Sequence, residues 1–194
     1  MTMQNLPAFP LQMLPLPGEV LPLHIFEPRY RQLLTDAEER DIEFVICPSS
    51  NVNPKGFGSI LKLEQVIRRF PTGESDIVVR AQDFCSVKEL QPYFRQKLYP
   101  GASIVRQNCD QTKMAGIELV LEFTDWQRQL KKSHHGGVLS VHHVATSLQL
   151  DLFDRIKFAA LSDSTREKFL IGRIRYEQKL LEVAENSKRL FHLN

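Results

Sequence analysis

The chain has 194 residues, of which 42% are apolar and 25% are charged, the composition of an ordinary globular protein rather than of a disordered segment. A chain of this length buries roughly 70% of its unfolded surface, so it needs neither disulfides nor a metal for stability. The 25 basic and 23 acidic side chains leave a net charge of +2. The densest basic pairs, Arg68-Arg69 and Lys131-Lys132, are short, so charge does not indicate a nucleic-acid partner.

The sequence carries no membrane or export signal and no cysteine motif. It has no apolar run of about 18 residues and no cation before Arg29, so we expect neither a membrane span nor a secretion signal. The cysteines Cys47, Cys85 and Cys109 are odd in number and lack CxxC spacing, which indicates neither a disulfide framework nor a zinc ribbon. We expect reduced thiols in the cytoplasm, each a small buried apolar side chain.

The prolines divide the chain. All eleven lie within residues 7–100. Proline is excluded from helix interiors and central strands but is tolerated in turns and edge strands. The sequence therefore predicts an α+β protein, with strands and turns over residues 1–108 and helices over residues 109–194.

The first half reads as short strands around one helix. Pro28 suits the first position of a helix, and this helix should continue to Arg40. A turn at Pro71-Thr72-Gly73-Glu74 should join two strands into a hairpin. The expected strands are 9–14, 20–23, 42–46, 58–70 and 76–80.

The apolar period changes after a short predicted strand at 104–105. Leu119, Phe123, Trp126 and Leu130 lie on one helical face. The alternation of apolar residues over 117–123 also permits a strand, but we favour the helix. Further helical segments are expected at 138–148 and 153–160, and a last helix should open with a capping box, as indicated by the Ser164-x-x-Glu167 pattern.

Common catalytic motifs are missing from the sequence. It has no phosphate-binding loop, dinucleotide fingerprint, HExxH helix or GxSxG elbow. Four histidines lie close together: His134, His135, His142 and His143. Adjacent histidines on a helix point about 100° apart and do not converge on one ion. We therefore expect solvated histidines, no metal and no cofactor.

One segment, residues 16–31, is unusual as a local string. Pro28 sets a helix start, and Glu27 lies by the positive end of that helix. Arg29 can reach back to carboxylates or carbonyls. Phe26 and Tyr30 are spaced to hold the helix on a sheet. On this interpretation the string fixes architecture and touches no ligand.

This string closely resembles the signature of the Lon substrate-binding domain, the N-terminal domain of the ATP-dependent Lon protease. The matches are Phe9-Pro10-Leu11, Pro17-Gly18 and the run from Pro22 to Arg31. The resemblance implies a PUA-like β-barrel followed by a helical bundle. The signature residues are Pro22, His24, Phe26, Glu27, Pro28, Arg29 and Tyr30.

In the full protease this domain helps capture substrates, whereas separate ATPase and Ser–Lys peptidase domains perform the chemistry. Because this sequence contains neither, we expect a non-catalytic module that binds unfolded or degron-bearing polypeptides in a groove between barrel and helices, with a Lon-type protease as candidate partner. The candidate peptide-binding residues are Phe57, Phe84, Tyr93, Phe94 and Tyr99. The alternatives are an RNA-binding PUA-like protein and an enzyme that uses a cysteine or histidine in a barrel pocket.

Overall fold

The first half of the chain, where apolar and polar residues alternate, forms one sheet, and the second half, where apolar residues recur with a helical period, forms helices. The computed structural model describes residues 2–130 and 139–191, with side chains as far as residue 184. The chain divides into two compact units. The strand unit comprises residues 1–111 and 150–160, and the helical unit comprises residues 112–149 and 161–194.

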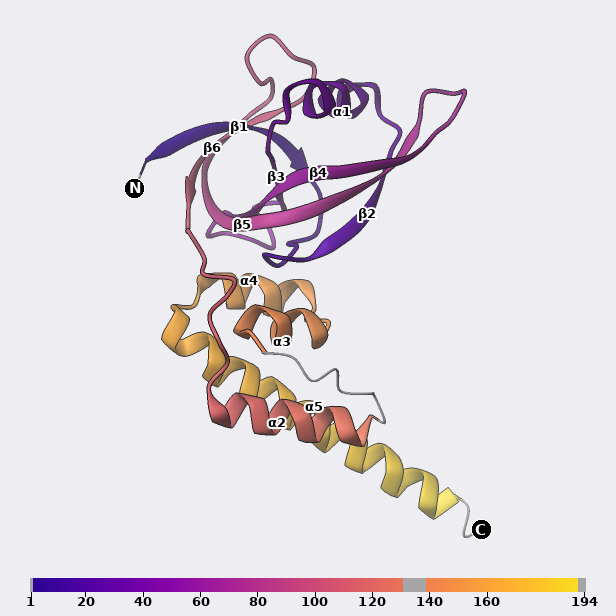
Figure 1. The fold of residues 1–194 in the computed structure, drawn as a ribbon, viewed down its shortest axis with the longest axis vertical. Coiled ribbons are helices and arrows are strands. Elements are labelled where there is room, and N and C mark those ends of the chain that lie inside the picture. The colour runs from indigo at the N-terminus through magenta and orange to yellow at the C-terminus, as the bar shows by residue number, and fades with distance from the viewer. Residues whose placement is uncertain (1, 131–138, 192–194) are drawn as a thin grey trace. The chain divides into compact units, whose positions relative to one another are not determined.

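Six strands build the sheet of the strand unit, in the order β2-β5-β4-β3-β1-β6. β5 also pairs with β6, so the pairings from β5 through β4, β3, β1 and β6 return to β5 and form a ring (Figure 1). β2 is not one of the five strands of this ring and pairs with the first part of β5, residues 75–80. The strands are β1 Met3–Pro10, β2 Val20–Ile25, β3 Phe44–Cys47, β4 Phe57–Arg69, β5 Ser75–Gln91 and β6 Gly101–Arg106.

The predicted hairpin is present and longer than expected. β4 and β5 are antiparallel neighbours joined by the predicted turn, and buried and half-buried residues alternate along most of β5. The first expected strand, 9–14, was wrong at both ends, because β1 runs from Met3 to Pro10 and residues 11–14 form no strand. Asp83 joins β5 to the segment that follows β6. Its carboxylate accepts hydrogen bonds from the backbone N–H groups of Phe84, Asn108 and Cys109.

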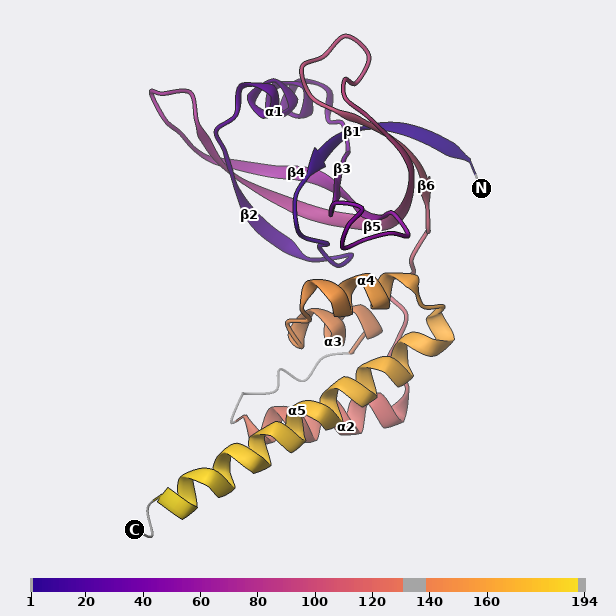
Figure 2. The ribbon, with the colours of Figure 1, turned by 180° about the vertical axis from the view of Figure 1, so that it is seen from behind.

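Two helices pack on the strand unit. α1 (Pro28–Arg40) has the predicted bounds, with Glu27 as N-cap residue, Pro28 at the first position and Asp41 in the left-handed region at its end. α4 (Leu152–Ala160) was predicted as a helix of the second half, but residues 150–160 belong to the strand unit. Figures 1 and 2 show α1 across one end of the ring and α4 at the other.

The helical unit contains α2 (Ile117–Gln129), α3 (Val141–Ser147) and α5 (Asp163–Phe191). The predicted apolar face of α2 is buried, which confirms the helix over the strand. The predicted capping box is wrong. α5 begins one residue before Ser164, and the Glu167 carboxylate accepts a hydrogen bond from the N–H of Gly116 at the start of α2, at 3.0 Å.

Candidate functional site

The second half of the signature segment builds the start of α1. Tyr30 is buried and its ring lies 4.0 Å from that of Phe9, centroid to centroid. Arg29 forms an ion pair with Glu27 at 2.8 Å and lies over the Tyr30 ring. Pro28 and Glu27 set the helix start as predicted. These four residues therefore build the start of α1 and its contact with β1.

The first half of the signature faces solvent. Pro22 and His24 are exposed on β2, and Phe26 is 56% exposed. The prediction that Phe26 fastens α1 to the sheet is therefore wrong. Its neighbour is instead the His24 ring, 6.1 Å away and stacked.

A cluster that we call the His24 patch forms around this ring: His24, Phe26, Arg68 and Phe70. The Phe70 ring lies edge-on to His24 at 6.0 Å, and the Arg68 guanidinium lies 4.5 Å from the Phe70 ring. His24 Nδ1 lies 2.7 Å from a carboxylate oxygen of Asp76. Sequence reasoning missed Phe70, whose only signal was its position beside the predicted turn.

Arg31 fixes the patch against α1. Its Nε donates to the Phe26 carbonyl at 2.8 Å and its Nη1 to the Thr72 carbonyl at 2.9 Å. The signature segment and the turn of the β4–β5 hairpin are thereby joined through one side chain. These two hydrogen bonds fix the backbone at Phe26 and at the turn that follows Phe70, which preorganises the patch.

Three of the five candidate peptide-binding residues lie in the loop of residues 92–100. Tyr93 is 63% exposed, whereas Tyr99 is buried and cannot contact a ligand in this conformation. Phe94 is half-buried and stacks on Tyr99 at 6.0 Å. The loop is fastened to α1 through Asp36, which accepts hydrogen bonds from the Tyr99 hydroxyl at 2.7 Å and from Lys97 at 2.9 Å.

The remaining two candidates lie in other parts of the strand unit. Phe84 is fully buried, with its ring edge-on to that of Phe158 on α4 at 6.3 Å. Phe57 is half-buried, and Asn53 bonds both its N–H and its carbonyl. The structure therefore does not gather the five residues into one surface. Tyr93 is the most exposed of them.

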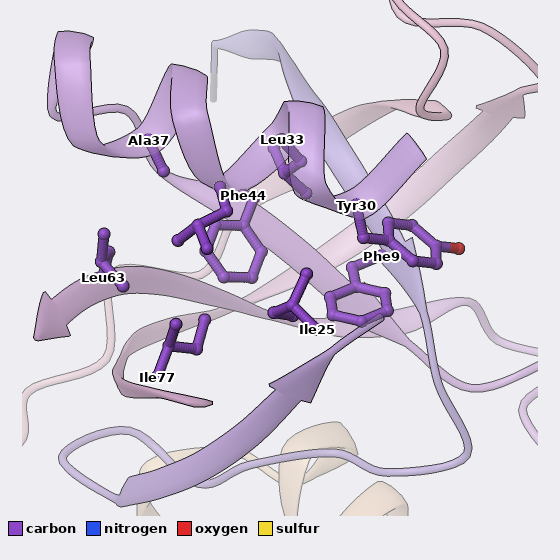
Figure 3. Close-up of a pocket in the computed structure, with 9 residues that line it drawn as sticks. Phe9, Ile25, Tyr30, Leu33, Ala37, Phe44, Leu63 and Ile77 are labelled. Carbon is purple, nitrogen blue, oxygen red and sulfur yellow. The ribbon is translucent and has the colours of Figure 1, made fainter. Parts of the chain in front are cut away.

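The space beneath α1 is packed core rather than a ligand site. Figure 3 shows side chains from α1 and from the strands pointing into it, among them Phe9, Ile25 and Leu33. The cavity left between them is about 10 Å³. That volume is at the limit for one water molecule, and the lining offers almost no polar surface to hold it.

A larger cavity, of about 240 Å³, opens beside the start of β2, and we call it the Arg155 pocket. Leu21 and the 12–14 segment line it together with Leu152 and Arg155 of α4. Arg155 donates from Nη1 and Nη2 to the two carboxylate oxygens of Glu19, at 2.6 and 2.9 Å. Because the two charges of this ion pair neutralise each other, the polar side of the pocket has no net charge. The other side is apolar and includes Leu21 and Leu152. No sequence motif indicated it.

The described cysteines lie in the strand unit, whereas His142 and His143 lie in the helical unit. Burial raises the pKa of the Cys47 thiol to about 11, and Cys85 is also buried. The expectation of solvated histidines is wrong for His142, which is buried in the helical unit, whereas His143 is exposed. His134 and His135 lie outside the described residues. Among the described residues, no group of His, Cys, Asp and Glu could hold a metal ion.

A family model and two solved structures relate this chain to the same kind of domain. Residues 5–192 match the model of the ATP-dependent protease La (LON) substrate-binding domain. The structure is similar to the crystal structure of a Lon N-terminal domain protein from Xanthomonas campestris, with a TM-score of 0.66 and 22% identity over 84% of this chain and 94% of that one. It also resembles the N-terminal domain of a Mycobacterium avium complex Lon protease, with a TM-score of 0.51 and 14% identity over 92% and 98% of the two chains. No curated protein sequence matches this chain. No helix of the described residues is long and apolar enough to span a membrane.

Proposed function

Since this chain belongs to the family of LON substrate-binding domains, we propose that it binds unfolded or degron-bearing polypeptides and takes no catalytic part in their breakdown. We assign the first contact to the His24 patch on the strand unit. We also propose that the closed ring of strand pairings is the PUA-like barrel implied by the family. A Lon-type protease is the proposed partner, and the free cysteines support a reducing compartment such as the cytoplasm.

The observation that carries this proposal is the exposure of Phe26. A phenylalanine that leaves more than half of its surface in water contributes little to folding, yet here its ring stacks on the ring of His24. His24 in turn contacts Phe70, and the Arg68 guanidinium lies over the Phe70 ring. Aromatic and arginine side chains on a preorganised surface are typical of sites that bind polypeptides. Nearby cations are largely engaged within the protein: Arg69 pairs with Glu38 and Arg29 with Glu27. This arrangement favours an apolar ligand over a phosphate backbone.

Fluorescence anisotropy with reduced, carboxymethylated lactalbumin tests the proposal, with the native protein as the folded control. The exposed half of the Phe26 ring corresponds to about 100 Å², or about 2.5 kcal/mol if it were wholly buried in a complex. Part of this is offset by the cost of ordering, so Phe26→Ser should weaken binding about tenfold. Phe153→Ser is the matched control, because Phe153 is 68% exposed on α4 and lies outside the patch.

Two results would contradict the proposal. One is the absence of saturable binding of the unfolded protein at tens of micromolar. The other is an equal loss of affinity in Phe26→Ser and Phe153→Ser, because general apolar adhesion, unlike a localised site, does not distinguish two exposed phenylalanines.

A further inference from the structure

We propose that the bound polypeptide forms an additional β-strand along the free edge of β2, with one apolar side chain in the Arg155 pocket. This inference rests on the proposed function and deepens it, because it specifies an extended, largely apolar segment as the ligand. Three features of β2 support this proposal. Its outer edge has unpaired backbone groups, its two ends meet the Arg155 pocket and the His24 patch, and its pairing is more regular than that of the other exposed strand edge, in β4.

The backbone of β2 is hydrogen-bonded to β5 along one edge, and the other edge is free to accept a further strand. Among the described residues it pairs with β5 and with no other strand. The N–H of Ala81 donates to the Glu19 carbonyl just before β2, at 2.9 Å. Opposite residues in an antiparallel sheet alternate between hydrogen-bonded and non-hydrogen-bonded pairs. Glu19 is bonded, so Leu21 and Leu23 also direct their backbone N–H and carbonyl groups towards β5. The backbone groups of the intervening residues therefore face away from the sheet.

Pro22 independently supports this assignment of the two sides. Proline has no N–H to donate, and within sheets it is found at outward-facing positions of edge strands, at the first residue of a strand or at bulges. Pro22 is not the first residue of β2, and the pairing of β2 has no register shift. Pro22 is one of the three outward residues, with Val20 before it and His24 after it. The free edge consequently offers three carbonyls but only two N–H donors.

The two ends of β2 meet the two binding features already described. Leu21 and Glu19 line the Arg155 pocket at the start of the strand, and His24 belongs to the His24 patch at its end. Figures 1 and 2 show β2 running from the α4 end of the ring towards the start of α1. A strand added to this edge would therefore reach from the pocket to the patch.

The far half of β4 is also exposed along an edge, but it suits a ligand less well. Its register with β5 is broken between Leu63 and Gln65 and again between Val66 and Arg68. Such bulges twist an edge away from further pairing. Arg69 at its end is paired with Glu38 of α1. β2, in contrast, pairs with β5 over six consecutive residues without a shift.

Backbone-modified peptides separate strand addition from simple apolar docking. The probe is the tightest-binding member of a set of overlapping twelve-residue peptides that tile carboxymethylated lactalbumin, measured with the full chain. A series of this peptide, N-methylated at one position at a time, retains the side chains but removes single N–H donors. Strand addition predicts that alternate positions lose at least tenfold in affinity, whereas the intervening positions change less than twofold.

A variant of the protein provides the second measurement. Pro22→Val restores the missing donor on the free edge, and one additional net hydrogen bond should tighten binding about fivefold. Pro54→Val is the matched control, because Pro54 is exposed in a turn outside β2, and its affinity should not change. Urea unfolding of both variants verifies that each remains folded.

The outcomes separate this inference from the proposed function. If no peptide binds, the proposed function fails and the strand addition fails with it. If peptides bind and Phe26→Ser weakens them, but the N-methyl series shows no alternation, the function stands and pairing with β2 is refuted. A folded Pro22→Val variant with unchanged or weaker affinity also counts against the pairing.

Discussion

Removal of the Asp36 carboxylate should destabilise the strand unit and release the loop of residues 92–100. Asp36→Ala leaves the hydroxyl of Tyr99, which is 1% exposed, without its acceptor, and an unsatisfied buried hydroxyl costs about 1–3 kcal/mol. The loss of the Lys97 ion pair adds about 1 kcal/mol or less, since this ammonium is partly exposed and can be solvated. We therefore expect a decrease of about 3 kcal/mol in the free energy of unfolding.

Urea denaturation at neutral pH measures this value. Asp36→Asn is the matched control: it retains an acceptor for the Tyr99 hydroxyl and should cost about 1 kcal/mol. A loss below about 1 kcal/mol in Asp36→Ala would refute the reasoning, because it would mean that water reaches the Tyr99 hydroxyl. A loss of similar size in both variants would assign the stabilisation to charge rather than to the buried hydrogen bond.

The pH dependence of the same variants provides a second check. Burial alone would raise the pKa of the Asp36 carboxyl, but the hydrogen bonds from Lys97 and Tyr99 outweigh it, and the pKa is lowered. The stabilising contribution is therefore complete above the ordinary carboxyl pKa of about 3.9 and is lost as the pH falls through the lower value of the folded state. The difference between the wild type and Asp36→Asn should be constant from pH 8 to about pH 5 and should shrink below about pH 4.

Three further predictions concern stability and thiol chemistry. Phe158→Ala removes the ring that fastens α4 to the strand unit and should cost about 3–5 kcal/mol in urea unfolding; a loss under 1 kcal/mol would contradict that anchoring. At pH 8 a thiol reagent should modify the half-buried Cys109 before Cys47, whose pKa is raised to about 11, and equal rates would mean that the sheet opens readily. Gly73 has φ +88°, and a Cβ there would lie 2.5 Å from Arg31 Nη1. Gly73→Ala should therefore lower the thermal midpoint by an amount that corresponds to about 1 kcal/mol or more, whereas an unchanged midpoint would show that the turn adapts.

Local chemistry made the helices and strands predictable. Pro28 set the start of α1 because proline suits the first helical position. The spacing of Leu119, Phe123 and Trp126 identified the buried face of α2, since only a helix places these side chains together. β1 was misplaced at both ends. It begins at Met3, and its end was extended too far because Leu11 and Met13 pack against the core without pairing as a strand.

Long-range pairing limited what the sequence could predict. The partner of Glu167 is Gly116, 51 residues away, and it competes with the local capping box that the Ser-x-x-Glu pattern indicates. The partner of Arg155 is Glu19, 136 residues away. The apolar face of α4 looks the same in sequence whether it packs on helices or on strands, so the pattern alone could not assign residues 150–160 to the strand unit.

The signature segment shows how burial separates a structural role from a binding role within one motif. Tyr30 is buried, so the fold itself requires an apolar ring at that position. Phe26 lies four residues earlier, a spacing that predicts the same face of a helix. It nevertheless leaves 56% of its surface in water, and a polar residue there would destabilise the fold little. An exposed ring stacked on a neighbouring ring requires another explanation, and the polypeptide ligand that we propose, which would cover this ring and pair with the edge of β2, supplies one.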